Sequence, residues 1–242
     1  MKYQIISDLH AEFHKDQGKE FISKLPVLSE TLVIAGDFAT YKMLKLRLFE
    51  VCSKWRNVLF TNGNHELYLS NRGQLNQICK DVKRKFPNFH RLDNSTVEID
   101  GQRFIGATMW FRNRPDNFNY QNLLNDFNMI IGFKKWVYSE NAKTLQYFAD
   151  NMRSGDIVVT HHAPCELSVP DRYRGEQLNR FYVCDISELI FERKPKACLH
   201  GHQHIAVDYQ LYDTRILSNP HGYPDEDFRF DPVEYANRVF II

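Results

Sequence analysis

The chain has 242 residues, of which 31 are basic and 30 acidic, so its formal net charge is only +1. With 43% hydrophobic residues it has the composition of a globular protein and is long enough for one sizeable α/β domain. The balanced charge gives no global field that would attract nucleic acid or an anionic membrane, which excludes binding driven by bulk charge.

The sequence also indicates the compartment. No apolar run approaches the roughly 18 residues that a membrane span requires, and the opening MKYQIISDLH turns acidic too soon for a signal peptide. The five cysteines are odd in number, widely spaced and form no CxxC pair, which is typical of reduced thiols. We therefore expect a cytoplasmic protein without a membrane partner, and nothing in the sequence indicates its oligomeric state.

Short apolar runs that end in polar turn residues alternate with helical patterns along the chain. The predicted elements, in order, are strands at 3–7 and 31–36, a helix at 41–55, a strand at 58–63, a helix at 75–86, a strand at 103–110, a helix at 145–152, a strand at 156–160, a helix at 186–190, a strand at 196–200, and strand-like runs near 206–217 and 238–242. This alternation favours an α/β fold with parallel pairing in the first half and antiparallel pairing near the end.

Two stretches fit neither pattern. Residues 111–135 are rich in Asn and aromatic residues, and residues 164–184 carry three arginines. Long irregular segments inside a compact domain are usually functional loops or lids. Because the chain has no repeat and no flexible linker, we predict a single domain over 1–242 with lid-like segments near 111–135 and 164–184.

Polar side chains follow five of the eight predicted strands. They are Asp8-Leu9-His10, Asp37, Asn64-His65-Glu66, His161-His162 and His202-Gln203-His204. Ligands of open α/β sheets bind beyond the carboxyl ends of the strands, which is where all of these residues are expected. Residues i and i+2 project to the same side of a strand end, so both histidines of the last motif can reach one site.

The chemistry of this set indicates metal binding. Imidazole, carboxylate and amide groups without a thiolate suit Zn²⁺, Mn²⁺, Fe²⁺ or Ni²⁺. The set is too large for one ion and suits two ions about 4 Å apart, bridged by a carboxylate. Each motif alone has an ordinary alternative, such as a turn, a helix cap or a core histidine. Five of them in order, each after a strand, favour a dimetal site at the carboxyl ends of the strands.

The ordered motifs closely resemble those of the calcineurin-like metallophosphoesterases, in particular small bacterial and phage members, over residues 8–204. The resemblance implies a four-layer α/β/β/α sandwich with two mixed β-sheets. It implies two divalent ions, of which one is held by Asp8, His10 and His204, the other by Asn64, His161 and His202, and both by the bridging Asp37. His65 would then face the phosphate, as general acid or transition-state stabiliser.

Two histidine assignments depend on position within the motifs. His161 is favoured over His162 as the ligand because it directly follows the predicted strand, and His162 is the alternative. His200 lies two residues before His202, ahead of the turn, and has no matching role in the resemblance. The resemblance further implies that a metal-bridging hydroxide attacks phosphorus in line, with Asp37 and His65 as the catalytic residues.

Differences from other members of the superfamily limit the classes of substrate that we expect. The arginines that clamp substrate in the protein phosphatases of this superfamily are absent, since the chain reads Gly36-Asp37-Phe38-Ala39-Thr40 and Leu67 follows Glu66. The capping domain usual in its DNA-processing nucleases has no counterpart after His204. We therefore expect a small phosphorylated substrate, for example a nucleotide, as phosphomonoester or phosphodiester. The alternatives are a non-catalytic metal-binding or scaffold module of the same fold and a nuclease.

Several other residues keep two interpretations. Arg172, Arg174 and Arg180 either bind a second phosphate or belong to a solvated loop. Among the aromatic residues, Trp110, Phe111, Phe118 and Tyr120 either stack on a base or pack a lid or core. His221 and Tyr223 either approach the site or belong to a rigid loop that covers the sheet.

Overall fold

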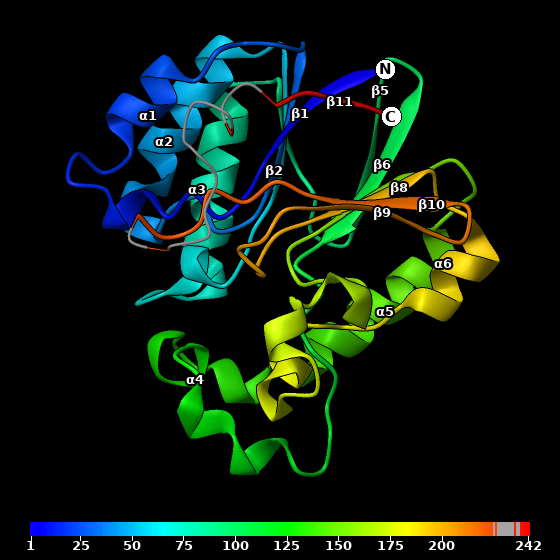
Figure 1. The fold of residues 1–242 in the computed structure, drawn as a ribbon. Helices are drawn as coiled ribbons and strands as arrows, with labels where there is room; N and C mark the ends of the chain where they lie inside the picture. The colour runs from blue at the N-terminus through cyan, green and yellow to red at the C-terminus, as the bar shows by residue number, and fades with distance from the viewer. Residues whose placement is uncertain (225, 227–234, 236–237) are drawn as a thin grey trace.

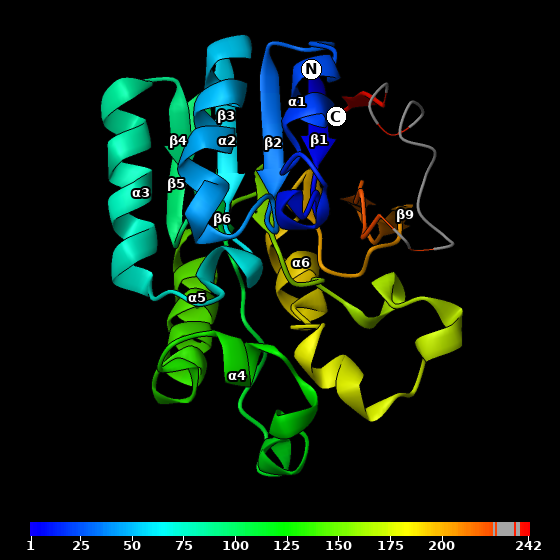
Figure 2. The same ribbon diagram turned by 90° about the vertical axis from the view of Figure 1, so that its left-hand side faces the viewer.

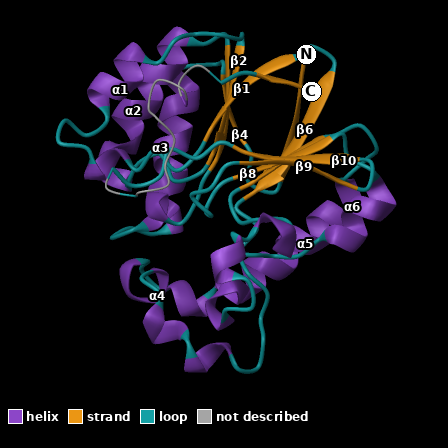
Figure 3. Cartoon of the chain, viewed as in Figure 1, coloured by secondary structure: helices purple, strands orange, loops and turns teal. Residues whose placement is uncertain are grey.

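The computed structural model describes residues 1–224, 226, 235 and 238–242. Two mixed β-sheets stack against each other and helices cover both outer faces, as the strands and helices of Figures 1 and 3 show. This arrangement confirms the predicted four-layer α/β/β/α sandwich. No helix within the described residues is long and apolar enough to cross a membrane.

The first sheet has the strand order β11-β1-β2-β3-β4. Four of its strands are parallel and β11 is antiparallel to β1. The strands are β1 (Lys2–Ile6), β2 (Thr31–Ala35), β3 (Asn57–Thr61), β4 (Phe89–Arg91) and β11 (Phe240–Ile241). The helices α1 (Lys19–Lys24), α2 (Tyr41–Lys54) and α3 (Arg72–Lys85) lie on its outer face (Figure 2).

The second sheet has the order β5-β6-β7-β8-β10-β9. Its four central strands are parallel, and both edge strands are antiparallel to their neighbours. The strands are β5 (Ser95–Ile99), β6 (Gln102–Ala107), β7 (Ile157–Thr160), β8 (Ala197–His200), β9 (Val207–Leu211) and β10 (Thr214–Ser218). The helices α5 (Val137–Asn151) and α6 (Ser187–Arg193) cover its outer face (Figure 1).

Alternating side chains of the strands fill the spaces between the layers. In β1, Ile5 belongs to the core between the two sheets, whereas Ile6 packs toward the helices of the first sheet. In β7, Val159 faces the first sheet and Val158 packs toward α5 and α6. Because each sheet is covered on both faces, its central strands read as continuous apolar runs, which explains why they were predictable.

The predicted strands and helices are present, with boundaries that differ by a few residues. The helix predicted from 75 begins at Arg72, since Asn71 and Gln74 form a capping box that starts it. The helix predicted at 145–152 begins at Val137 and ends at Asn151. The prediction did not include the short elements β4, β5, α1 and α4 (Asp126–Met129).

The two irregular segments, 111–135 and 164–184, lie side by side beyond one end of the sheets (Figures 1 and 2). They contain α4 and short turns of 3₁₀ helix. Phe181 packs edge-on against Phe111, and Arg180 forms an ion pair with Asp116 across the two segments. The assignment of residues 1–242 to one domain stays a prediction, because residues 225, 227–234 and 236–237 lie outside the described residues.

Candidate metal centre

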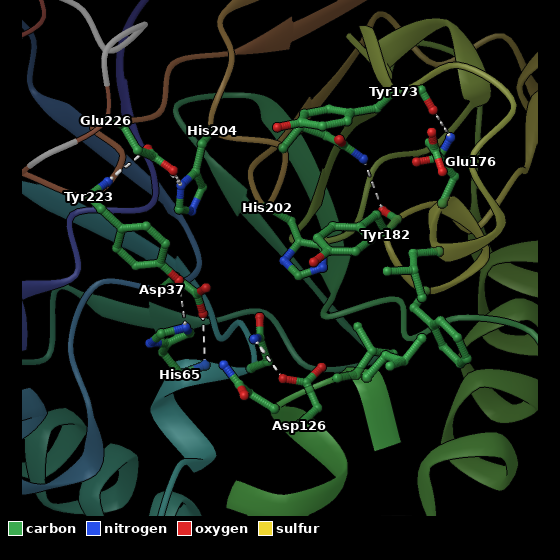
Figure 4. Close-up of a pocket in the computed structure, with 18 of the residues that line it drawn as sticks. Asp37, His65, Asp126, Tyr173, Glu176, Tyr182, His202, His204, Tyr223 and Glu226 are labelled. Atoms are coloured by element: carbon green, nitrogen blue, oxygen red, sulfur yellow. Dashed lines mark hydrogen bonds and ion pairs between the residues drawn. The ribbon is translucent and has the colours of Figure 1, made fainter. Parts of the chain in front are cut away.

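The structure brings all seven predicted ligands to one place, at the carboxyl ends of five strands. Asp8 and His10 follow β1, Asp37 follows β2, and Asn64 follows β3. His161 follows β7, and His202 and His204 follow β8. Figure 4 shows Asp37, His65, His202 and His204 around one open space. The two sheets therefore contribute to the same site from opposite sides.

The backbone turns sharply at most of these positions. Asp8, His10, Asp37, His202 and His204 all have positive φ, between 48° and 71°. Residues other than glycine rarely adopt this left-handed conformation, which costs about 1–3 kcal/mol and concentrates at functional sites. The strain directs five side chains inward immediately after their strands end.

Glycines make room for the ligands. A Cβ added at Gly63 would overlap both Asp37 Oδ1 and the ring of His161, although the φ of Gly63 is not positive. A Cβ at Gly201 would lie 2.7 Å from both Asp8 Oδ2 and the carbonyl oxygen of Ala35. The ligand side chains thus pack directly on backbone that only glycine allows.

The first ligand cluster contains Asp8, His10 and His204, whose ligand atoms lie within 4.8 Å of one another. The Nε2 atoms of His10 and His204 are 2.9 Å apart, and His204 Nε2 lies 3.7 Å from Asp8 Oδ1. Two neighbouring nitrogens bound about 2.1 Å from one ion are about 3 Å apart, so this spacing suits a shared cation. Asp8 Oδ2 is buried without a hydrogen-bond partner in the described residues, as expected of an oxygen that binds a cation.

The second ligand cluster surrounds His161. Its Nε2 lies 3.0 Å from Asn64 Oδ1 and 3.3 Å from Asp37 Oδ2, and His202 belongs to the same group. Its Nδ1 donates to the carbonyl oxygen of Ala35, at 3.0 Å, which leaves Nε2 as the nitrogen for a metal.

His162 makes different contacts, although its ring also lies beside that of His202. Its Nδ1 donates to the carbonyl oxygen of Thr108, and its ring packs against Trp110. Burial, together with the neighbouring His161, lowers the pKa of His162 to about 3. His162 belongs to none of the candidate metal groups formed by the described residues.

Asp37 lies between the two clusters. Its Oδ2 is 3.3 Å from His161 Nε2 and 3.8 Å from His10 Nε2. Its Oδ1 accepts a hydrogen bond from the backbone N–H of His65, which fixes the carboxylate. This is the position that a carboxylate bridging two ions requires.

The electrostatics of the site favour cations. Burial opposes protonation of His161, but the carboxylates of Asp37 and Asp8 outweigh it and raise the pKa of His161 to about 10. In contrast, burial and the neighbouring histidines hold the pKa of His202 well below its ordinary value. A metal ion in the field of these carboxylates would displace the proton of His161. The donor set and its charge therefore fit two divalent ions.

Outer partners that sequence reasoning missed hold several of these groups. Glu226 accepts from His204 Nδ1, at 2.9 Å, and so directs Nε2 of that ring to the first cluster. Glu12 Oε1 lies 2.7 Å from His65 Nδ1. Burial opposes protonation of His65, but the carboxylates of Asp37 and Glu12 outweigh it and raise its pKa above the ordinary value.

Glu66 is a structural residue of the site. Its fully buried carboxylate accepts hydrogen bonds from the backbone N–H groups of four residues, Asp37, Phe38, Ala39 and Gly63. It therefore joins the turn after β2 to the turn after β3 and fixes the distance between Asp37 and Asn64.

This arrangement predicts a large effect for Glu66→Gln, although the two side chains have almost the same shape. Each carboxylate oxygen accepts from two N–H groups, so the new amide group would face two donors wherever it lies. We expect the free energy of unfolding to fall by about 2–3 kcal/mol, measured by urea denaturation. The exposed Glu98→Gln is the control, and equal stability of the two variants would contradict this role for Glu66.

His65 faces the space between the clusters. Its Nε2 is 3.3 Å from the hydroxyl of Tyr223, and its ring stacks on Tyr68. Tyr223 also packs its ring against His10 and His204, so the segment after β10 does approach the site. His65 is itself within reach of a cation together with His10 and Asp37.

A cavity of about 580 Å³ opens from the metal centre. Its floor includes Asp37, Asn64 and His65, and its far walls come from residues 123–126 and 172–182 of the two irregular segments. Leucine and aromatic side chains form much of those walls, and Glu176 and Asp126 contribute carboxyl groups. Both irregular segments thus border the site.

The structure shows which of the aromatic residues and arginines considered in the sequence border the cavity. Trp110 and Phe111 are buried in the core, so their packing role holds and they are not base-stacking groups. Phe118 is exposed and Tyr120 lies under Arg180; neither borders the cavity. Among the arginines, Arg172 lines the cavity, whereas Arg174 pairs with Asp171 and Arg180 with Asp116.

Within the described residues, the side chain of His200 forms no hydrogen bond with a candidate metal ligand. Its ring nitrogens form hydrogen bonds with the hydroxyl of Ser168 and the carbonyl oxygen of Gly201. His221 is buried in an aromatic group with His14, Phe21 and Tyr235. The contacts of His200 therefore agree with its omission from the ligand set. The contacts of His221 agree with a loop that covers the sheet, and not with a position in the metal centre.

Comparisons with known proteins agree with this geometry. The model of the calcineurin-like phosphoesterase family matches residues 1–206. An uncharacterised protein of Acanthamoeba polyphaga mimivirus is 24% identical over 270 residues, which cover 96% of this chain and 95% of that protein.

Solved structures share the fold at low sequence identity. Phosphopantetheinyl hydrolase from Mycobacterium tuberculosis has a TM-score of 0.71 at 14% identity, covering 92% of this chain and 90% of that chain. A dimetal phosphatase from Danio rerio has a TM-score of 0.51 at 10% identity, covering 90% of this chain and 86% of that chain. These similarities support the four-layer fold.

Proposed function

This chain belongs to the calcineurin-like phosphoesterase family, and we propose that it hydrolyses a small molecule that carries a single phosphate group, as a monoester or a diester. The observation that carries this proposal is the convergence of seven candidate metal ligands, four of which line a cavity with little positive charge of its own.

The ligand clusters support a specific division of the two divalent ions. Asp8, His10 and His204 would hold one ion, and Asn64, His161 and His202 the other, with Asp37 bridging both. Mn²⁺, Fe²⁺, Zn²⁺ and Ni²⁺ all suit these donors. When bound, such ions activate water as a nucleophile and neutralise the oxygens of the phosphoryl group.

We propose that His65 acts on the leaving group. Glu12 holds its Nδ1 and the surrounding carboxylates favour its protonated form, so Nε2 can donate a proton to the departing oxygen. The hydroxyl of Tyr223 lies beside the same nitrogen and is placed to bind a phosphoryl oxygen. Neither residue needs to bind metal for these roles.

The cavity supports a substrate with one phosphate. Beyond the metal ligands and His65, the described residues that line it include one cationic side chain, Arg172, and the carboxyl groups of Asp126, Glu176 and Glu226. A polyphosphate or a nucleic acid strand would bring further negative charge next to these carboxyl groups, whereas nucleic-acid sites neutralise several phosphates. The leucine and aromatic walls instead suit an uncharged, partly apolar group such as a nucleoside.

A substrate panel tests this proposal. We expect kcat/KM for a nucleoside monophosphate, or its methyl diester, to exceed that for the triphosphate and for a short oligonucleotide by about tenfold or more, which corresponds to one unfavourable charge contact of roughly 1.4 kcal/mol. Higher kcat/KM for the triphosphate or the oligonucleotide would contradict it. p-Nitrophenyl phosphate and its bis ester, assayed with Mn²⁺, Ni²⁺ and Zn²⁺ in turn, distinguish the monoesterase from the diesterase.

A charge reversal sharpens that test. Glu176→Lys adds a cation to the cavity wall and should raise relative activity toward the triphosphate. Glu166→Lys on the same segment is the matched control, because Glu166 is exposed and does not line the cavity.

We also propose that the protein acts in the cytoplasm, since all five cysteines are unpaired.

A further inference from the structure

Asn64 has two chemically different ends, and only its oxygen suits a metal ion. Its Oδ1 lies 3.0 Å from His161 Nε2, in the second ligand cluster. Its Nδ2 donates to Asp126 Oδ1 at 2.9 Å and to the hydroxyl of Tyr68 at 3.2 Å. Both hydrogens of the amide are therefore used on the side away from the cluster.

Asp126 allows only one of the two possible orientations of the Asn64 amide. Its Oδ1 accepts two hydrogen bonds, from Asn64 Nδ2 and from the Tyr68 hydroxyl, which is 2.8 Å away. If the Asn64 amide turned over, its oxygen would face this oxygen acceptor and its NH₂ group would face the metal position. Both contacts would be repulsive.

The irregular segment 111–135 holds Asp126 in place. Asp126 is buried and is the first residue of α4. Two backbone hydrogen bonds join this region to the chain just after His65, from the N–H of Leu69 to Met129 and from the N–H of Ile131 to Ser70. Figure 4 shows Asp126 among the residues that line the cavity.

We propose that Asp126 is a positioning residue that fixes the oxygen of Asn64 toward one of the two metal sites. Through it, that one site depends on the segment 111–135, whereas the Asp8, His10 and His204 site does not. This inference rests on the proposed function for the role of Asn64 as a ligand. Partners that orient metal ligands typically change metal affinity by about 10–100-fold.

The test is a titration of the chelator-treated full chain with Mn²⁺ in which calorimetry measures each binding step. The wild type should bind two ions. Asp126→Asn should weaken one of the two binding steps by about 10–100-fold and leave the other unchanged. Tyr68→Phe, which keeps the carboxyl group of Asp126, should weaken the same step by a smaller factor.

A reciprocal exchange separates positioning from general damage. The double variant Asn64→Asp with Asp126→Asn restores an acceptor and a donor at this contact, in exchanged places, and leaves a carboxylate oxygen for the metal. It should recover the weakened step. Asp156→Asn is the control for loss of a buried carboxylate elsewhere, because Asp156 pairs with Arg103 at the start of β7. It should leave both steps unchanged.

The outcomes separate the two proposals. If the wild type binds two ions and Asp126→Asn weakens neither step or both equally, the inference about Asp126 is overturned and the proposed function stands. If the double variant binds no better than Asp126→Asn, the inference is also overturned. If the wild type binds no metal, the proposed function fails and this inference fails with it.

Discussion

Asp37→Ala is expected to abolish phosphoester hydrolysis and to reduce the bound metal to fewer than two ions per chain. Asp37 is the carboxylate within reach of both ligand clusters, at 3.3 Å from His161 Nε2 and 3.8 Å from His10 Nε2. Its loss removes the shared ligand and one negative charge of the site. We expect kcat to fall by a factor of about a thousand or more, since metal-ion catalysis contributes several kcal/mol.

Metal analysis by mass spectrometry and the initial rate with p-nitrophenyl phosphate measure both effects. Asp208→Ala is the control, because Asp208 pairs with Arg215 on the edge of the second sheet and belongs to none of the candidate metal groups. A variant of Asp37 that retains two ions and full activity would show that Asp37 is not the bridge.

His65→Ala is expected to keep both ions and to lose rate. Its Nδ1 is held by Glu12 and its Nε2 faces the space in front of the ligand clusters, beside Tyr223. Removing a general acid typically costs about 10²–10⁴-fold in kcat. Glu12→Gln should lower kcat by a smaller factor, since the ring stays hydrogen-bonded but loses a charge that favours its protonated form.

The leaving group distinguishes proton donation from phosphate binding. p-Nitrophenolate leaves without much help from an acid, whereas an alkoxide does not. If His65 donates the proton, the loss of kcat in His65→Ala is larger for an alkyl phosphate than for p-nitrophenyl phosphate. An equal loss for both substrates would assign His65 to binding the phosphoryl group, and loss of a metal ion would make it a ligand instead.

The convergence of the candidate ligands was predictable because each lies within a few residues of the end of a strand that the apolar pattern reveals. Asp8, Asp37 and His161 follow strands whose buried residues form continuous runs, so their place at one edge of the sheets follows from the α/β pattern. The choice of His161 rests on the same argument, and its contacts with Asp37 and Asn64 agree with it.

The orienting partners were not predictable in the same way. Glu12 contacts a residue 53 positions away, and Asp126 contacts one 62 positions away. Tyr223 reaches His65 across 158 positions. Such contacts depend on how loops pack in three dimensions, and a single Glu or Asp in an irregular segment carries no local pattern. The carboxylate of Glu12, two residues after the candidate ligand His10, is the one weak signal.

The missing secondary-structure elements have a similar cause. β4 has three residues and α4 has four, too few for a period to be visible. β5 reads Ser95–Ile99 with only two apolar residues, and its exposed side chains alternate as expected of an edge strand. Trp110 and Phe111 kept two interpretations in the sequence, because an aromatic pair in a loop looks the same whether it covers a ligand or a core, and their burial agrees with the packing interpretation.

The metal dependence of hydrolysis by the chelator-treated chain tests most directly whether two bound ions carry the reaction. Mn²⁺ is added in known ratios, and the initial rate with p-nitrophenyl phosphate or its bis ester is recorded at each ratio. We expect no hydrolysis without metal and a plateau at two ions per chain. Hydrolysis without metal, a plateau at one ion, or two tightly bound ions without hydrolysis of any phosphoester in the panel would contradict it.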